Sequence, residues 1–104
     1  MRESILVTGA AAGLGKEMAL YLAGRGLRVY ATIREMSAAD HLLAAARSRN
    51  VELKVMPLDV TDKASIENAV EAIVAESGGI YAVINNAGIG LRGYFEDLES
   101  QEIR

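Results

Sequence analysis

A glycine-rich segment near the amino end has the residue types that a phosphate-binding turn needs. Residues 8–15 read Thr-Gly-Ala-Ala-Ala-Gly-Leu-Gly, at the point where a short apolar run gives way to a helical pattern. The first amides of a helix have no intrahelical partner, and the helix dipole places partial positive charge there. Small residues let phosphate oxygens approach the backbone, and glycine allows a tight turn. The segment therefore predicts a site for a pyrophosphate.

The spacing of the glycines narrows the kind of nucleotide site. Gly9, Gly13 and Gly15 form Gly-x-x-x-Gly-x-Gly rather than the commoner Gly-x-Gly-x-x-Gly. The segment lacks the Gly-Lys-Ser/Thr ending of a P-loop, so hydrolysis of nucleoside triphosphates is not expected. An S-adenosylmethionine methyltransferase would carry an acidic residue ahead of the glycines, where Val7 and Thr8 stand. The remaining alternative is a glycine-rich turn that binds no ligand.

Two further polar segments follow expected strands. Asp59-Val60 comes after the third apolar run, and Asn85-Asn86-Ala87-Gly88 comes after the fourth. Each has an alternative as a plain turn, because Asp and Asn side chains readily bond their own backbone two residues on. For Asp59, an Asx turn leading into the next helix and a ligand contact could hold together.

Together these segments resemble the short-chain dehydrogenase/reductase family, over essentially the whole chain and in register. Residues 8–15 match the family's Thr-Gly-x-x-x-Gly-x-Gly, and residues 85–88 match its Asn-Asn-Ala-Gly. The resemblance implies that Asp59 hydrogen-bonds the adenine amino group and that the asparagine segment stabilises the sheet and lines the cofactor ribose. It implies a nicotinamide dinucleotide held by Gly9, Ala11, Ala12, Gly13, Leu14, Gly15, Arg34, Asp59, Val60, Asn86, Ala87 and Gly88.

The end of the second strand favours NADP over NAD. Ile33 occupies the position where NAD-preferring relatives carry an Asp that binds the ribose 2′-OH. Arg34 follows directly, as in NADP-preferring relatives, and a guanidinium can pair bidentately with a 2′-phosphate. Two residues argue for NAD instead: Glu35 would repel a phosphate if it pointed inward, and Ala12 stands where some NADP-preferring relatives add a basic residue. Arg34 and Glu35 could also be solvated loop charges.

The catalytic residues of the family cannot be placed in this sequence. The resemblance implies a Tyr-x-x-x-Lys pair that moves the proton, with a serine and an asparagine in support. The residues four positions after the four tyrosines are Arg25, Arg34, Asn85 and Leu98. We therefore expect no catalytic residue in this chain, a truncated domain, and no activity from it alone. The family transfers hydride between nicotinamide and an alcohol or carbonyl substrate; the alternative function is a non-catalytic dinucleotide-binding module.

Short apolar runs alternate with helical patterns along the chain, which predicts the elements that position these residues. Strands are expected at residues 4–8, 27–33, 51–58 and 80–84, and helices at 14–25, 38–49, from Thr61 or Asp62 to 78–79, and from 95 to 104. In the first helix Leu14, Met18 and Leu22 share one side. Such alternation gives a parallel sheet with right-handed crossovers. We predict one α/β domain over residues 1–104, a Rossmann-like doubly wound sheet; the resemblance adds the strand order 3-2-1-4, truncated after the fourth strand.

Composition excludes several other classes of protein. Apolar residues make up 51% of the chain and the net charge is −3 without a basic stripe, so we expect a folded domain and no nucleic-acid partner. Cysteine is absent and His41 is the one histidine, so disulfides are excluded and a metal site is not expected. No apolar stretch approaches the length of a membrane span, and the expected location is the cytoplasm. The run at 80–84 would be an apolar edge strand, which predicts self-association.

Overall fold

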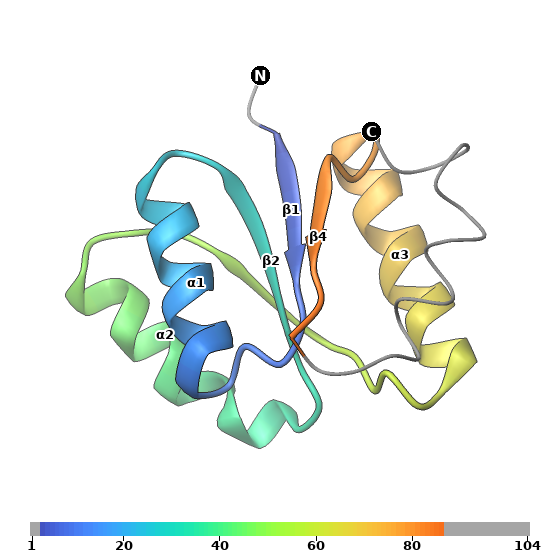
Figure 1. The fold of residues 1–104 in the computed structure, drawn as a ribbon, viewed down its shortest axis with the longest axis horizontal. Coiled ribbons are helices and arrows are strands. Elements are labelled where there is room, and N and C mark those ends of the chain that lie inside the picture. Colours follow the sequence, from blue (N-terminus) through green and yellow to red (C-terminus); the bar gives the residue numbers. More distant parts are fainter. Residues whose placement is uncertain (1–2, 87–104) are drawn as a thin grey trace.

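Helices cover both faces of a parallel sheet in the computed structural model, which describes residues 3–86 (Figure 1). The elements are, in order, β1 (Ser4–Val7), α1 (Gly13–Gly24), β2 (Arg28–Ile33), the 3-10 turn η1 (Met36–Ala38), α2 (Ala39–Ser48), β3 (Lys54–Pro57), α3 (Lys63–Ser77) and β4 (Ala82–Ile84). All strand pairs are parallel, and the order across the sheet is β3-β2-β1-β4. The predicted fold class and strand order are confirmed.

Alternate residues of β1 and β2 face opposite sides of the sheet, as the two-residue period of a strand requires. Ile5 and Val7 pack with α1 and α2 in one buried cluster. Leu6 and Tyr30 pack with α3 in a second cluster on the other face. The central strands are therefore buried on both sides, which is the arrangement expected for parallel sheets covered by crossover helices.

The ends of α3 are fixed by residues that suit helix termini. Asp62 is the N-cap, and its carboxylate accepts hydrogen bonds from the amides of Ala64 at 3.0 Å and Ser65 at 3.4 Å. Gly78 closes the helix in the left-handed conformation at φ 88°, and its amide donates to Val74 O at 2.8 Å. Of the two predicted capping residues, Asp62 is the one that caps.

The buried face of α1 differs from the predicted one. Leu14 is 67% exposed, so the expected stripe that began at Leu14 is wrong. The buried residues are instead Gly15, Ala19, Leu20 and Ala23. Three of these are small and lie four residues apart, so they share one side of the helix. The helix therefore lies close to the sheet on its small residues, and the larger Leu14 stays on the outside.

The third strand is shorter than predicted, for a reason that lies at the end of α2. The chain leaves that helix through Asn50 in the left-handed conformation at φ 58°, and the amide of Val51 donates to Ala46 O at 2.9 Å. Val51 thus belongs to the helix termination, and pairing with β2 starts only at Lys54.

The predicted helix at 95–104 lies outside the described residues. No helix between residues 3 and 86 is both long and apolar enough to cross a membrane.

Candidate functional site

The turn between β1 and α1 lies at the end of the sheet where the strands finish. Gly9 and Gly13 have φ angles of 64° and 61°, in the region that favours glycine over residues with a side chain. Between them the amide of Ala10 donates to Thr32 O at 3.0 Å, which ties the turn to the end of β2. The predicted glycines are therefore required by the backbone path of this turn.

Gly15 is the point of closest packing at the start of α1. A Cβ atom built on Gly15 would lie 2.2 Å from Gly9 O and 2.7 Å from Asn86 Nδ2, far inside contact distance. A Cβ built on Gly13 would meet nothing within 4 Å. The two glycines thus have different roles. Gly15 allows the start of α1 to pack closely against the turn, whereas Gly13 allows a positive φ angle at a point where the space beside it is open.

The first turn of α1 has no side-chain cap for its opening amides. Its N-cap is Ala12, which has no side-chain acceptor, and its first turn carries no acidic residue. The opening amides of a helix point their N–H groups outward, at the positive end of the dipole. A free helix start is a general binding position for anions such as phosphate, whereas the first amides of α3 are already bonded to Asp62.

Thr8 joins this turn to the end of β4. Its side chain is buried, and its hydroxyl oxygen accepts a hydrogen bond from the amide of Asn86 at 2.9 Å. The side-chain amide of Asn86 donates in turn to Gly9 O at 3.3 Å. The structure therefore brings Asn86 against the glycine turn, although the two segments lie more than 70 residues apart in the sequence. Ala87 and Gly88 lie outside the described residues.

The ends of β2 and β3 bring two further predicted residues together. Ile33 pairs with Pro57 in the parallel register, and the amide of Leu58 donates to Ile33 O at 2.9 Å. The residues that follow each strand therefore leave the sheet side by side. Arg34 Nε lies 3.8 Å from Asp59 Oδ2, with the side chains 72% and 33% exposed. An ion pair this exposed contributes little stability by itself.

Asp59 forms the Asx turn that the sequence analysis left open as an alternative to a ligand contact. Its Oδ1 accepts from the Thr61 amide at 3.0 Å and from the Thr61 hydroxyl at 2.6 Å, while its own amide donates to Ser65 Oγ at 2.9 Å. The hydrogen bonds from Thr61, with a smaller contribution from the charge of Arg34, lower the pKa of Asp59 from its usual value. Asp59 is therefore held as a carboxylate at neutral pH. Val60 beside it is half-buried and packs against the cluster beneath α3.

Sequence reasoning missed the connecting groups in this site. Thr8 was counted as part of the glycine segment, although its hydroxyl is what joins that segment to Asn86. Ser65 and the pairing of Arg34 with Asp59 were not predicted. The strand order was the available signal for the pair, because neighbouring parallel strands end at the same edge of a sheet.

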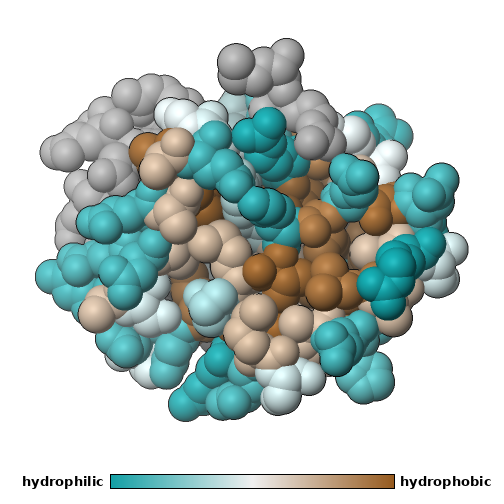
Figure 2. All heavy atoms as spheres, turned by 180° about the vertical axis from the view of Figure 1, so that it is seen from behind, coloured by the Kyte–Doolittle hydropathy of each residue, from teal (hydrophilic) through white to brown (hydrophobic). Residues whose placement is uncertain are grey.

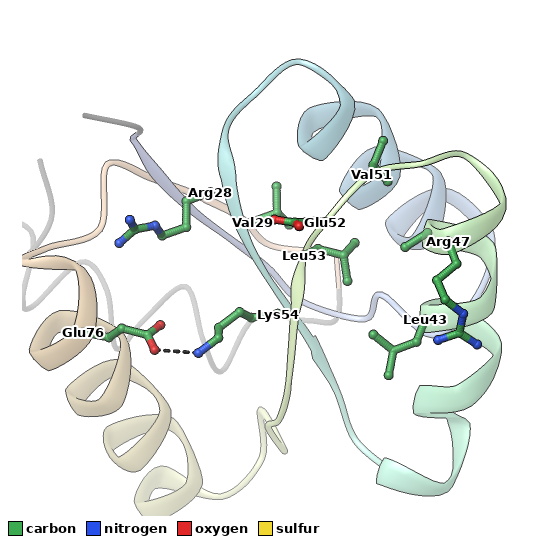
Figure 3. A pocket seen from close by; sticks show the side chains of 10 residues that line it. Arg28, Val29, Leu43, Arg47, Val51, Glu52, Leu53, Lys54 and Glu76 are labelled. Atoms are coloured by element: carbon green, nitrogen blue, oxygen red, sulfur yellow. Dashed lines mark hydrogen bonds and ion pairs between the residues drawn. The ribbon is translucent and has the colours of Figure 1, made fainter.

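A cavity of about 620 Å³ lies away from this site, where β2 and β3 begin (Figure 3). Val29, Leu43 and Leu53 contribute apolar lining, and on its other side Lys54 Nζ donates to Glu76 Oε2 at 2.6 Å. Glu76 also accepts from the hydroxyl of Tyr30 at 2.6 Å. Seen from behind, the most hydrophobic surface lies mainly just right of the centre of the view, with hydrophilic residues along its right side (Figure 2). The part of the chain that the structure describes holds no group of three His, Cys, Asp or Glu side chains placed for a metal ion.

Comparison with known proteins gives consistent matches. Residues 3–104 match the short chain dehydrogenase family. An uncharacterized oxidoreductase of Myxococcus xanthus (strain DK1622) is 41% identical over 85 residues, which cover 82% of this chain and 34% of that protein. Retinol dehydrogenase 12 of Bos taurus is 37% identical over 102 residues, covering 94% and 32%. A variant actinorhodin polyketide ketoreductase crystallised with NADPH has a TM-score of 0.77 at 37% identity, over 84% of this chain and 33% of that one. The chain thus spans about a third of the length of the relatives it matches.

Proposed function

The chain belongs to the short-chain dehydrogenase family, and from that premise we propose that it forms the dinucleotide-binding part of an NADP-dependent oxidoreductase. The family uses NAD or NADP, and the bound nicotinamide supplies the site that gives or takes up hydride. The substrate class we propose for the complete enzyme is a small alcohol or carbonyl compound. Relatives named as a retinol dehydrogenase and a polyketide ketoreductase support that class.

The observation that carries the proposal is the construction of the glycine turn. Gly15 lies so close to Gly9 and Asn86 that a single Cβ would not fit, and the space beside Gly13 is open. The residues fit a dinucleotide on this ground: the helix start offers amide donors, with no acidic side chain in its first turn. We assign the pyrophosphate to residues 9–15 and the adenosine to the ends of β2, β3 and β4. The assigned set is Gly9, Ala11, Ala12, Gly13, Leu14, Gly15, Arg34, Asp59, Val60, Asn86, Ala87 and Gly88.

The preference for NADP rests on the residues that end β2. Ile33 is 1% exposed, so its side chain is committed to the core and does not reach a ribose. Arg34 is 72% exposed on the edge where the strands finish, which supports a contact between its charge and a 2′-phosphate. The NADPH carried by the ketoreductase relative is consistent with this assignment.

A second candidate function is a binding module that holds dinucleotide without turnover. The observation behind it is that no tyrosine in the sequence has a lysine four positions later. For the 104 residues alone we expect this behaviour. An assay of NADPH consumption with simple aldehydes and ketones separates the two, because a rate above background would show that the chain itself is catalytic.

The test of cofactor preference is the variant Arg34→Ala, measured by titration with NADP⁺ and NAD⁺. A bidentate arginine–phosphate contact is strong, so we expect NADP⁺ affinity to fall about tenfold or more and NAD⁺ affinity to change little. Arg25→Ala is the matched control, since it removes one exposed arginine at the end of α1 away from the glycine turn and should leave both affinities unchanged. Equal losses for both dinucleotides in Arg34→Ala would overturn the 2′-phosphate assignment.

A further inference from the structure

The two oxygens of the Asp59 carboxylate have separate partners. Oδ1 takes both hydrogen bonds from Thr61, while Oδ2 faces Arg34 Nε at 3.8 Å. The backbone around this carboxylate is also fixed, because the amide of Asp59 donates to Ser65 Oγ at 2.9 Å. Asp59 is thus a well-anchored group beside an arginine whose side chain is otherwise 72% exposed.

Which atom of Arg34 faces Asp59 decides which of its N–H donors remain available to a ligand. A guanidinium is planar, with five N–H donors in a fixed fork. When Nε faces the carboxylate, the edge formed by the two terminal nitrogens stays available to a ligand. An exposed arginine without such a neighbour samples many rotamers, and a ligand that requires one of them must first select it.

We propose that Asp59 is a positioning residue for Arg34, and that it thereby sets how strongly the site prefers a 2′-phosphorylated adenosine to an unphosphorylated one. The inference rests on the proposed function and adds to it a second role for Asp59. The carboxylate also repels a phosphate, and this repulsion, which salt screens in part, acts against the effect of orientation. The proposal is that orientation prevails, so removal of the Asp59 charge should lower the preference for the phosphorylated ligand rather than raise it.

The experiment compares two ligands, adenosine 2′,5′-bisphosphate and 5′-AMP, on the 104-residue chain at 0.15 M salt. The ligands share adenine, ribose and 5′-phosphate, so any contact of Asp59 with adenine cancels in the ratio of their dissociation constants. The key variant is Asp59→Asn, which keeps an oxygen for Thr61 and removes the charge beside Arg34. We expect the wild-type chain to favour the bisphosphate and the ratio to fall about two- to fivefold in Asp59→Asn, the range of an exposed ion pair.

Two further variants make the test specific. In an Arg34→Gln background, Asp59→Asn should leave the ratio unchanged, because its effect passes through Arg34. Thr61→Ala removes the hydroxyl bond alone and should lower the ratio by a smaller factor; it carries the test if Asp59→Asn fails to fold by circular dichroism. A wild-type ratio near one contradicts the proposed NADP preference. A wild-type preference that Asp59→Asn leaves unchanged or increases overturns the positioning role only.

Discussion

The clearest structural prediction concerns Gly15, where one added methyl group should disturb both the fold and the site. In Gly15→Ala the new Cβ would lie 2.2 Å from Gly9 O and 2.7 Å from Asn86 Nδ2. Backbone on one side and the side chain of Asn86 on the other leave no simple relief. Overpacking of this kind costs about 1–3 kcal/mol, and loss of the Asn86–Gly9 hydrogen bond adds about 1 kcal/mol. We therefore expect the free energy of unfolding to fall by about 3 kcal/mol.

Gly24→Ala is the matched control in the same helix. A Cβ on Gly24 would have Val51 Cγ1 as its nearest neighbour at 3.5 Å, an ordinary contact. Alanine is also a better helix former than glycine by about 0.5–1 kcal/mol, so this variant should be neutral or slightly more stable. Urea unfolding followed by circular dichroism measures both. If Gly15→Ala unfolds within about 1 kcal/mol of Gly24→Ala, the close packing inferred for the start of α1 is wrong.

Three further predictions concern the groups that join the elements. Thr8→Val removes the acceptor of the Asn86 amide and should lower the free energy of unfolding by about 1–2 kcal/mol in urea titrations. Thr8→Ser keeps the hydroxyl and should lose less stability. Equal losses in the two variants would rule out the hydroxyl as the cause. Asp62→Ala removes the cap of α3 and should cost about 1 kcal/mol in the same assay, with Asp62→Asn close to wild type; no difference between the two would show that the cap does not matter. The pKa of Glu76 is lowered from 4.5, mainly by the hydrogen bond from Lys54 and next by the hydrogen bond from Tyr30. The contribution of Glu76 to stability is therefore complete above the pKa that it has in the unfolded chain, and it is lost as pH falls through the lower pKa of the folded state. The Tm difference between wild type and Glu76→Gln should therefore be constant from pH 6 to 8 and shrink below about pH 4.5, and a difference independent of pH would contradict this.

The order of elements and the sheet could be predicted from the sequence because each rests on local information. Short apolar runs, helical spacing and glycine ends recur along the chain, and the glycine and asparagine segments fall at strand ends. The family resemblance then supplied the strand order that the structure confirms. The Asx turn at Asp59 was also predictable, because its hydrogen bonds join residues only two apart.

What the sequence did not predict depends on distances between elements. The predicted buried side of α1 was wrong because it was chosen by large apolar residues such as Leu14. Close approach of the helix to the sheet instead requires small residues such as Gly15 and Ala19 on the buried side. The contact of Arg34 with Asp59 joins residues 25 positions apart that meet only through the register of β2 and β3. The self-association expected through the strand at 80–84 stays a prediction, and a monodisperse monomer at high concentration in light scattering would refute it.

The most direct test of the proposed dinucleotide site is to follow backbone amide shifts by NMR as NADP⁺ is added to the ¹⁵N-labelled chain. We predict that the largest saturable shifts fall on residues 9–15, where the amides of the turn and of the start of α1 lie, with further shifts at Arg34 and Asp59. The cavity where β2 and β3 begin supplies an internal comparison, since Leu53 and Lys54 lie at the other end of the sheet. Shifts that concentrate there, or no saturable shift on residues 9–15 at millimolar NADP⁺, would contradict the account.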